Sequence, residues 1–185
     1  MRIAARDTMA SMGLFDRHRL PDDVRASLRE HLAAEGVRTP LRVLAWAKTA
    51  DGVLVGLPDR FALLGPGGSW TSLPWHRVLS ATWDDAGSVF VWRTVTRPHA
   101  LQSVEMSDPG RMPELVRERV EQTIVSRQVV DLAPGVQATL TGRRPAEGDG
   151  PVEWSVVPPR GVDLRRPELA AAVRDLIERA RRDWG

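Results

Sequence analysis

Residues 42–68 read RVLAWAKTADGVLVGLPDRFALLGPGG, and this stretch decides the fold class. It contains three apolar runs separated by short connections: Arg42–Thr49, Val53–Leu57 and Arg60–Leu64. The first connection, Ala50-Asp51-Gly52, contains the Asp-Gly pair that favours a hairpin turn. Pro58-Asp59 marks a second bend. The stretch therefore predicts three consecutive antiparallel strands.

The same pattern continues to about Met106 and predicts four more strands. They are Ser69–Leu73, Arg77–Trp83, Ser88–Val95 and Ala100–Glu105. Asp84-Asp85-Ala86-Gly87 has the composition of a hairpin loop between two of these strands. Seven strands with such short connections predict an antiparallel sheet that curls into a sandwich or a barrel.

Helices are expected on both sides of the strands. Pro21–Glu35 should form the first helix, because proline and two aspartates suit a first turn and Gly36 suits a C-terminal stop. Asp108–Arg127 should form the second helix, with an apolar stripe at helical spacing. We assign residues 1–19 to a flexible segment, 20–36 to the N-terminal helix and 38–128 to a domain of seven strands and a helix.

The pattern of residues 129–185 predicts a smaller unit that packs on this core or mediates self-association. Val136–Arg143 and Val152–Val157 read as the two strands of a hairpin, joined by a polar loop. Pro167 opens a last helix, which has one apolar and one charged face. The predicted fold class is α+β.

Seven antiparallel strands followed by one amphipathic helix resemble a pleckstrin-homology-like (PH-like) domain. Two local segments also resemble bacterial PH-like domains: the bend and Asp-Arg step of LPDRFALL (residues 57–64), and the W-x-x-V step of WTSLPWHRV (residues 70–78). The resemblance covers about half of the chain. It implies a seven-strand barrel capped by a helix, on a scaffold that usually binds other molecules and rarely catalyses a reaction. The loop Lys48–Gly52 matches the position of a basic lipid-binding loop but has one lysine and one aspartate, so we do not expect lipid-headgroup binding.

Composition excludes several classes of site and of protein. The chain has 185 residues and no cysteine, so disulfides, thiolate metal sites and thiol nucleophiles are impossible. No apolar run reaches the length of a membrane span. The first residues lack the apolar region of a secretory signal, and we therefore expect a cytoplasmic protein.

Arginine supplies nearly all of the positive charge. Lys48 is the only lysine among 26 basic residues, while Asp and Glu number 24. The net charge is only +2, and the pI of about 10.2 reflects the scarcity of groups that titrate between histidine and arginine. The high pI is therefore weak evidence for a nucleic-acid partner.

Motifs of catalysis and cofactor binding are absent from the sequence. The four histidines include no pair at helical metal-ligand spacing, and no G-x-S-x-G or G-x-G-x-x-G motif occurs. Gly65-Pro66-Gly67-Gly68 lacks the lysine and the helix of a phosphate-binding loop, so it reads as a turn. We predict no enzymatic activity, no catalytic residue, no cofactor and no metal.

The function predicted first is a protein-interaction or assembly module. Tryptophan and arginine are enriched at binding surfaces, and Trp70 and Trp75, which flank a proline, are the tryptophans expected to be exposed. The candidate interaction residues are Trp70, Trp75, Arg77, Arg143, Arg144, Arg181 and Arg182. Two alternatives remain open: a nucleic-acid or ribonucleoprotein binder that uses the arginine-rich C-terminal third, and a barrel that encloses a small ligand.

Overall fold

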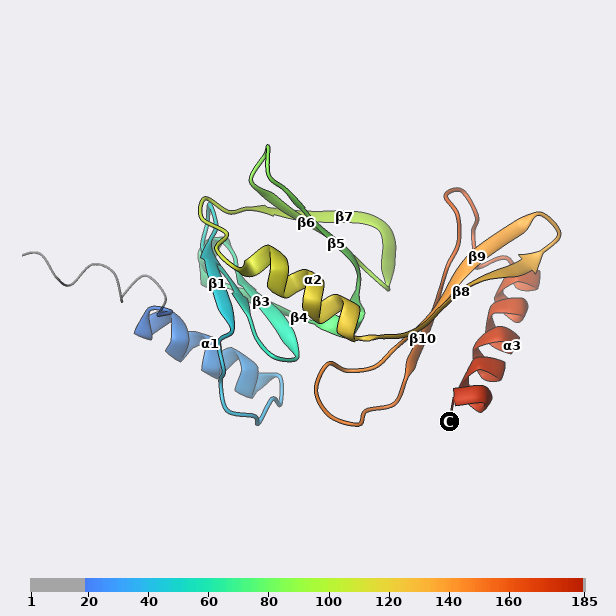
Figure 1. The fold of residues 1–185 in the computed structure, drawn as a ribbon, viewed down its shortest axis with the longest axis horizontal. Helices are drawn as coiled ribbons and strands as arrows, with labels where there is room; N and C mark the ends of the chain where they lie inside the picture. The colour runs from blue at the N-terminus through green and yellow to red at the C-terminus, as the bar shows by residue number, and fades with distance from the viewer. Residues whose placement is uncertain (1–18, 185) are drawn as a thin grey trace, which may run out of the picture. The chain divides into compact units, whose positions relative to one another are not determined.

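The computed structural model describes residues 19–184. The chain divides into two units, residues 1–41 and 42–185. Within the described residues, the structure has three α-helices and three antiparallel sheets, which confirms the α+β class (Figure 1). The predicted flexible segment 1–19 lies, except for its last residue, outside the described residues.

The first unit contains helix α1, Asp22–Ala34, close to the predicted range. Pro21 precedes its first turn. Gly36 has φ +80° just beyond the end of α1, a conformation that favours glycine as a helix stop. Leu28 and Leu32, four residues apart, form the buried side of the helix.

The second unit begins with a four-stranded antiparallel sheet of order β1-β2-β3-β4. Its strands are β1 (Ala45–Lys48), β2 (Val53–Gly56), β3 (Arg60–Leu64) and β4 (Trp70–Pro74). The turn between β1 and β2 requires glycine, because a Cβ on Gly52 would lie 2.2 Å from the Leu64 carbonyl oxygen. The predicted hairpin is therefore present, and its Asp-Gly turn passes close to the end of β3.

The next three strands form a second antiparallel sheet of order β5-β6-β7. They are β5 (Val78–Asp84), β6 (Val89–Thr94) and β7 (Arg97–Glu105). Thr49 and Met106 form an isolated antiparallel bridge just beyond the ends of β1 and β7. The seven predicted strands are all present, but in the described part of the chain they form two separate sheets that do not close into a barrel.

An aromatic cluster fills the core between these elements. Phe61 lies 5.4 Å from Trp75 and 5.5 Å from Trp92, measured between ring centroids. Phe90 stacks on Trp92 at 5.1 Å. Helix α2 (Met112–Gln122) packs on the same cluster with Met112, Leu115, Val116 and Val120.

The predicted second helix was too long. Helix α2 ends at Gln122, and residues Ile124–Ala133 form strand β8, which was not predicted. Val120 and Ile124 follow the apolar spacing of a helix, so the sequence pattern does not indicate that a strand begins at Ile124. The following residues are rich in valine, which favours strands, and the Thr123 hydroxyl bonds the Val120 carbonyl oxygen at 2.7 Å, at the end of the helix.

Strand β8 converts the predicted C-terminal hairpin into a third antiparallel sheet, of order β10-β9-β8. Strand β9 spans Val136–Arg143 as predicted, and β10 spans Glu153–Val157. Helix α3 (Pro167–Trp184) packs on one face of this sheet. A Cβ on Gly142 would lie 2.9 Å from the Trp154 ring, so the ring fits there because residue 142 has no side chain.

None of the helices formed by residues 19–184 combines the length and the apolar character needed to cross a lipid bilayer.

Candidate functional site

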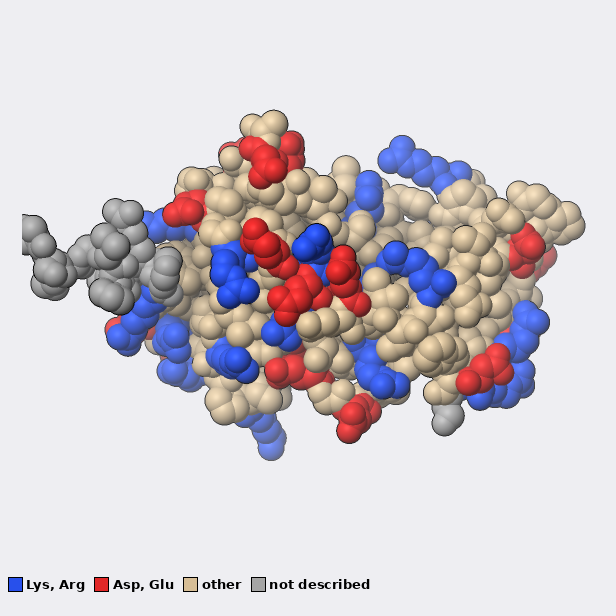
Figure 2. All heavy atoms as spheres, in the orientation of Figure 1, with Lys and Arg blue, Asp and Glu red and all other residues tan. Residues whose placement is uncertain are grey.

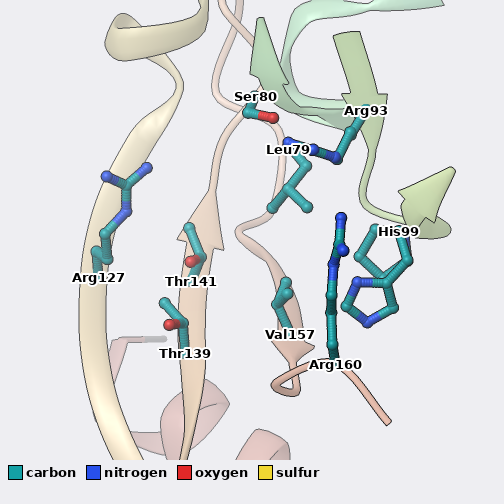
Figure 3. Close-up of a pocket in the computed structure, with 10 residues that line it drawn as sticks. Leu79, Ser80, Arg93, His99, Arg127, Thr139, Thr141, Val157 and Arg160 are labelled. Atoms are coloured by element: carbon teal, nitrogen blue, oxygen red, sulfur yellow. The ribbon is translucent and has the colours of Figure 1, made fainter. Parts of the chain in front are cut away.

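A cleft of about 480 Å³ lies between the β5–β7 sheet and the face of the β8–β10 sheet that does not carry α3 (Figure 3). This volume is within the range of small-molecule sites. We call it the basic cleft. The residues that line it are Leu79, Ser80, Arg93, Pro98, His99, Arg127, Thr139, Thr141, Val157 and Arg160.

Strand alternation directs one wall of side chains into the basic cleft. On β9, Ala138 and Leu140 are buried in the clusters that include α3. Successive strand residues point to opposite faces, so Thr139 and Thr141 face the cleft. Arg127 on β8 is the direct cross-strand partner of Thr141 and shares its face.

The opposite wall comes from β5, β6 and the start of β7. On β6, Phe90, Trp92 and Thr94 are buried, and Arg93 belongs to the other face. Ser80 on β5 pairs with Arg93 across the sheet. The register of the β5–β6 pairing shifts next to Ser80, and the register of the β6–β7 pairing shifts at Arg93. Such bulges redirect side chains and are common next to binding sites.

The turn after β10 supplies the third arginine. Arg160 lies in the Pro158–Gly161 turn and extends toward Arg93 in the basic cleft, with His99 beside it (Figure 3). Arg127 stands apart from these two, beyond Thr141. The guanidinium groups are therefore distributed over both walls.

The basic cleft has an unbalanced positive charge. No aspartate or glutamate is among its lining residues. The side chains of Arg93, Arg127 and Arg160 have neither an ion pair nor a hydrogen bond with any residue that the structure describes. Elsewhere several arginines pair with carboxylates, for example Arg60 with Asp59 at 2.9 Å and Arg165 with Asp163 at 2.9 Å.

Arg143 is buried next to this cleft, on the same face of β9 as Thr139 and Thr141. Its guanidinium donates to the Thr123 hydroxyl at 2.9 Å, to the Leu79 carbonyl at 3.0 Å and to the Val120 carbonyl at 3.4 Å. Burial and the nearby charge of Arg127 lower the pKa of Arg143 to about 10, so it remains protonated at neutral pH. Arg143 therefore adds positive charge beside the cleft and links α2, β5 and β9.

A second hollow, of about 600 Å³, lies between β5 and α2. It is lined by Asp85 and Glu114 as well as by Arg117, together with Trp83 and other residues. Two acidic side chains and one basic side chain line it, so it lacks the uniformly positive lining of the basic cleft.

Two of the predicted interaction residues are buried, which corrects the expectation that they lie on the surface. Trp75 is 0% exposed, and its indole N–H donates to the Leu57 carbonyl at 2.9 Å. Arg143 is 1% exposed. Trp75 begins a short 3₁₀ turn, Trp75–Arg77, that directs its ring into the core, and the α2 C-terminus and a β5 carbonyl bind the Arg143 side chain.

The other predicted interaction residues belong to separate elements. Trp70 on β4 is half-buried, whereas Arg77 is exposed and lies 3.9 Å from Glu153. Arg144 is exposed after β9, and Arg181 and Arg182 are exposed in the last turn of α3. Trp184, at the end of α3, is 48% exposed and makes an edge contact with Trp154.

The arginines of the basic cleft were not singled out from the sequence. Arg93, Arg127 and Arg160 are far apart along the chain and belong to no motif. The alternation along β6 could have placed Arg93 on the face opposite Phe90 and Trp92. Arg127 could not have been placed, because it was assigned to the end of a helix.

Residues 19–184 contain no group of three or more His, Asp or Glu side chains that could hold a metal ion. Comparison of the chain with models of known protein families, with curated proteins and with solved structures found no match.

Proposed function

We propose that this protein is a non-enzymatic binding module that holds an anionic ligand in the basic cleft. One observation carries the proposal: three arginines without carboxylate partners line a single hollow, together with a histidine and three hydroxyl side chains. Guanidinium groups and hydroxyls donate hydrogen bonds to carboxylate and phosphate oxygens. An anion would supply the acceptors and the negative charge that the described residues do not provide there.

A binding role accounts for the cleft better than a catalytic one. The lining residues include no carboxylate and no lysine, so only His99 could act as a general base. His99 is exposed, and no described residue orients its ring through a hydrogen bond or an ion pair.

The PH-like scaffold is part of the same proposal. The order of four strands, three strands and a helix, with α2 packed on the shared core, agrees with the element order of PH-like domains. The bridge between Thr49 and Met106 joins the ends of the first and seventh strands. The third sheet and α3 are additions to that pattern, and the third sheet supplies one wall of the basic cleft.

Nucleic acid and a protein partner are less favoured as ligands. A nucleic-acid surface needs a continuous basic stripe, whereas acidic and basic side chains are interspersed on the face shown in Figure 2, with acidic groups over α2. A protein interface centred on Trp75 would need its ring at the surface, and this ring is buried.

The proposal is tested by thermal unfolding, followed by tryptophan fluorescence, with citrate, inorganic phosphate and inorganic pyrophosphate at low ionic strength. A ligand that binds only the native state raises the midpoint of unfolding. We expect at least one of these anions to do so. The shift should disappear in the double variant Arg127→Gln/Arg160→Gln.

The matched control is Arg181→Gln/Arg182→Gln, which removes the same charge from exposed positions in the last turn of α3. This control should keep the full shift. If none of the three anions raises the midpoint of the wild type, or if both double variants lose the shift equally, the basic cleft is not the binding site.

A further inference from the structure

The charge of the basic cleft restricts the charge of its ligand. Three guanidinium groups line it, with no carboxylate among the lining residues. A phosphate monoester carries about 1.5–2 negative charges at neutral pH, so one such group would leave the cleft positive. Two linked phosphoryl groups on one ester carry about three negative charges. That number matches the three arginines that line the cleft, apart from the buried Arg143 beside it.

The positions of the donors suit two linked groups rather than one. Arg93 and Arg160 extend toward one another from opposite walls, while Arg127 stands apart beyond Thr141 (Figure 3). Each guanidinium can bind two oxygens of one phosphoryl group in a planar fork. One phosphoryl group would therefore lie between Arg93 and Arg160, and the other beside Arg127 and Thr141.

Part of the lining is apolar. Leu79, Pro98 and Val157 contribute carbon surface to the basic cleft. Burial of apolar ligand atoms against these side chains is favourable, and inorganic anions have no such atoms. The volume of about 480 Å³ leaves room for an organic group beside the phosphates.

We propose that the ligand of the basic cleft is an organic diphosphate, in which a diphosphate group is esterified to an apolar or aromatic body. This inference rests on the proposed anion-binding function and narrows it to one ligand class. The diphosphate groups bind the three arginines and the hydroxyls of Thr139 and Thr141. The organic body lies against Leu79, Pro98 and Val157.

Isothermal titration of the full chain tests this assignment with four probes: adenosine diphosphate, adenosine monophosphate, inorganic pyrophosphate and citrate. Adenosine diphosphate should bind at least about tenfold more tightly than each of the others, because it alone combines two phosphoryl groups with an organic body. Arg127→Gln and Arg160→Gln should each weaken this binding by about tenfold or more. Arg144→Gln, an exposed change outside the cleft, should leave it unaltered.

The outcomes separate the two proposals. If citrate binds as tightly as adenosine diphosphate and both need Arg127, anion binding stands and the diphosphate assignment fails. If inorganic pyrophosphate equals adenosine diphosphate, the apolar wall is not used and the organic part of the assignment fails. If no probe binds, none of the simple anions shifts the unfolding midpoint and the vesicle experiment described next shows no binding, both proposals fail.

An organic diphosphate can be a free nucleotide or the headgroup of a polyprenyl lipid, and a vesicle experiment distinguishes these sources. Co-sedimentation compares phosphatidylcholine vesicles with and without a polyprenyl diphosphate. Sedimentation that requires the diphosphate lipid and Arg127 identifies a lipid source, and binding of adenosine diphosphate alone identifies a soluble one. Either result supports the ligand class. Binding of neither diphosphate overturns it.

Discussion

The guanidinium group of Arg143 donates a 2.9 Å hydrogen bond to the hydroxyl of Thr123, the residue that follows the last turn of α2. The same guanidinium reaches the Val120 carbonyl at the end of that helix and the Leu79 carbonyl on β5. A cation at a helix C-terminus also balances the negative end of the helix dipole. One buried side chain thus connects the helix of the aromatic core to the sheet that forms a wall of the basic cleft.

Loss of this link should be costly. Arg143→Ala removes three hydrogen bonds, to Thr123, Val120 and Leu79, and takes the guanidinium donor from the Leu79 carbonyl, while the Thr123 hydroxyl and the Val120 carbonyl keep the bond between them. We expect the free energy of unfolding to fall by roughly 2–4 kcal/mol. Arg144→Ala is the matched control, because it removes a neighbouring exposed arginine, and it should change stability by less than about 0.5 kcal/mol. Urea unfolding followed by circular dichroism measures both. Equal losses in the two variants would contradict the structural role of Arg143.

The burial of Trp75 predicts a second stability difference. Trp75→Phe removes the indole N–H that donates to the Leu57 carbonyl and places a smaller ring in the aromatic core. We expect the free energy of unfolding to fall by about 2 kcal/mol. Trp184→Phe should cost less than about 1 kcal/mol, since that ring is half exposed and phenylalanine keeps a contact with Trp154. Chemical denaturation compares the variants. A larger loss for Trp184→Phe would contradict the assignment of Trp75 to the core.

Stability should fall on mild acidification because of His76. Burial lowers the pKa of His76 below its usual value, the charge of Glu153 opposes this, and the charges of Arg77 and Arg143 add to the lowering. The unfolded chain therefore takes up this proton before the native state does. The stabilisation that depends on neutral His76 is complete above about pH 6.5. It is lost as the pH falls from there through the pKa of His76 in the folded protein.

The measurement for His76 is the unfolding midpoint in urea as a function of pH between about 5 and 8. His76→Gln should flatten the decrease below about pH 6.5. His99→Gln, at an exposed histidine, should retain it. An unchanged pH profile in His76→Gln would show that another group causes the decrease.

The close approach of the first hairpin turn to β3 should make Gly52 intolerant of a side chain. Gly52→Ala would place a Cβ 2.2 Å from the Leu64 carbonyl oxygen, a backbone atom held in the β2–β3 pairing. We expect a loss of at least about 2 kcal/mol, because the backbone must shift. Gly65→Ala is the control: its nearest atom would lie at 3.8 Å, an ordinary contact. Thermal unfolding that ranks Gly65→Ala as the more damaging change would refute the close approach at Gly52.

Local signals made most of the secondary structure predictable, and a competing local signal caused the main error. The strand Arg60–Leu64 was predicted with its correct bounds, because a Pro-Asp bend and a glycine-rich turn enclose it. Strand β8 was missed because Val120 and Ile124 continue the spacing of the helix. The choice between helix and strand there depends on pairing with β9, which no short window of sequence contains.

The candidate site was much less predictable than the elements that carry it. Arg143 and Arg144 are neighbours in the sequence and were assigned the same surface role, yet one is buried and the other exposed. Strand alternation indicates that the two point to opposite sides. Alternation does not indicate which side of the strand is covered by other elements of the fold.

The amino-acid sequence by itself determined the α+β class, the seven consecutive strands, the hairpin turn at Gly52 and the exclusion of cysteine chemistry. Each of these follows from composition or from interactions between residues close in the chain. Only the tertiary structure decided that Arg93, Arg127 and Arg160 line one cleft, that Trp75 and Arg143 are buried, and that β8 joins a third sheet. These outcomes depend on packing between segments distant in sequence, because burial and charge balance are set by the neighbours that the fold brings together.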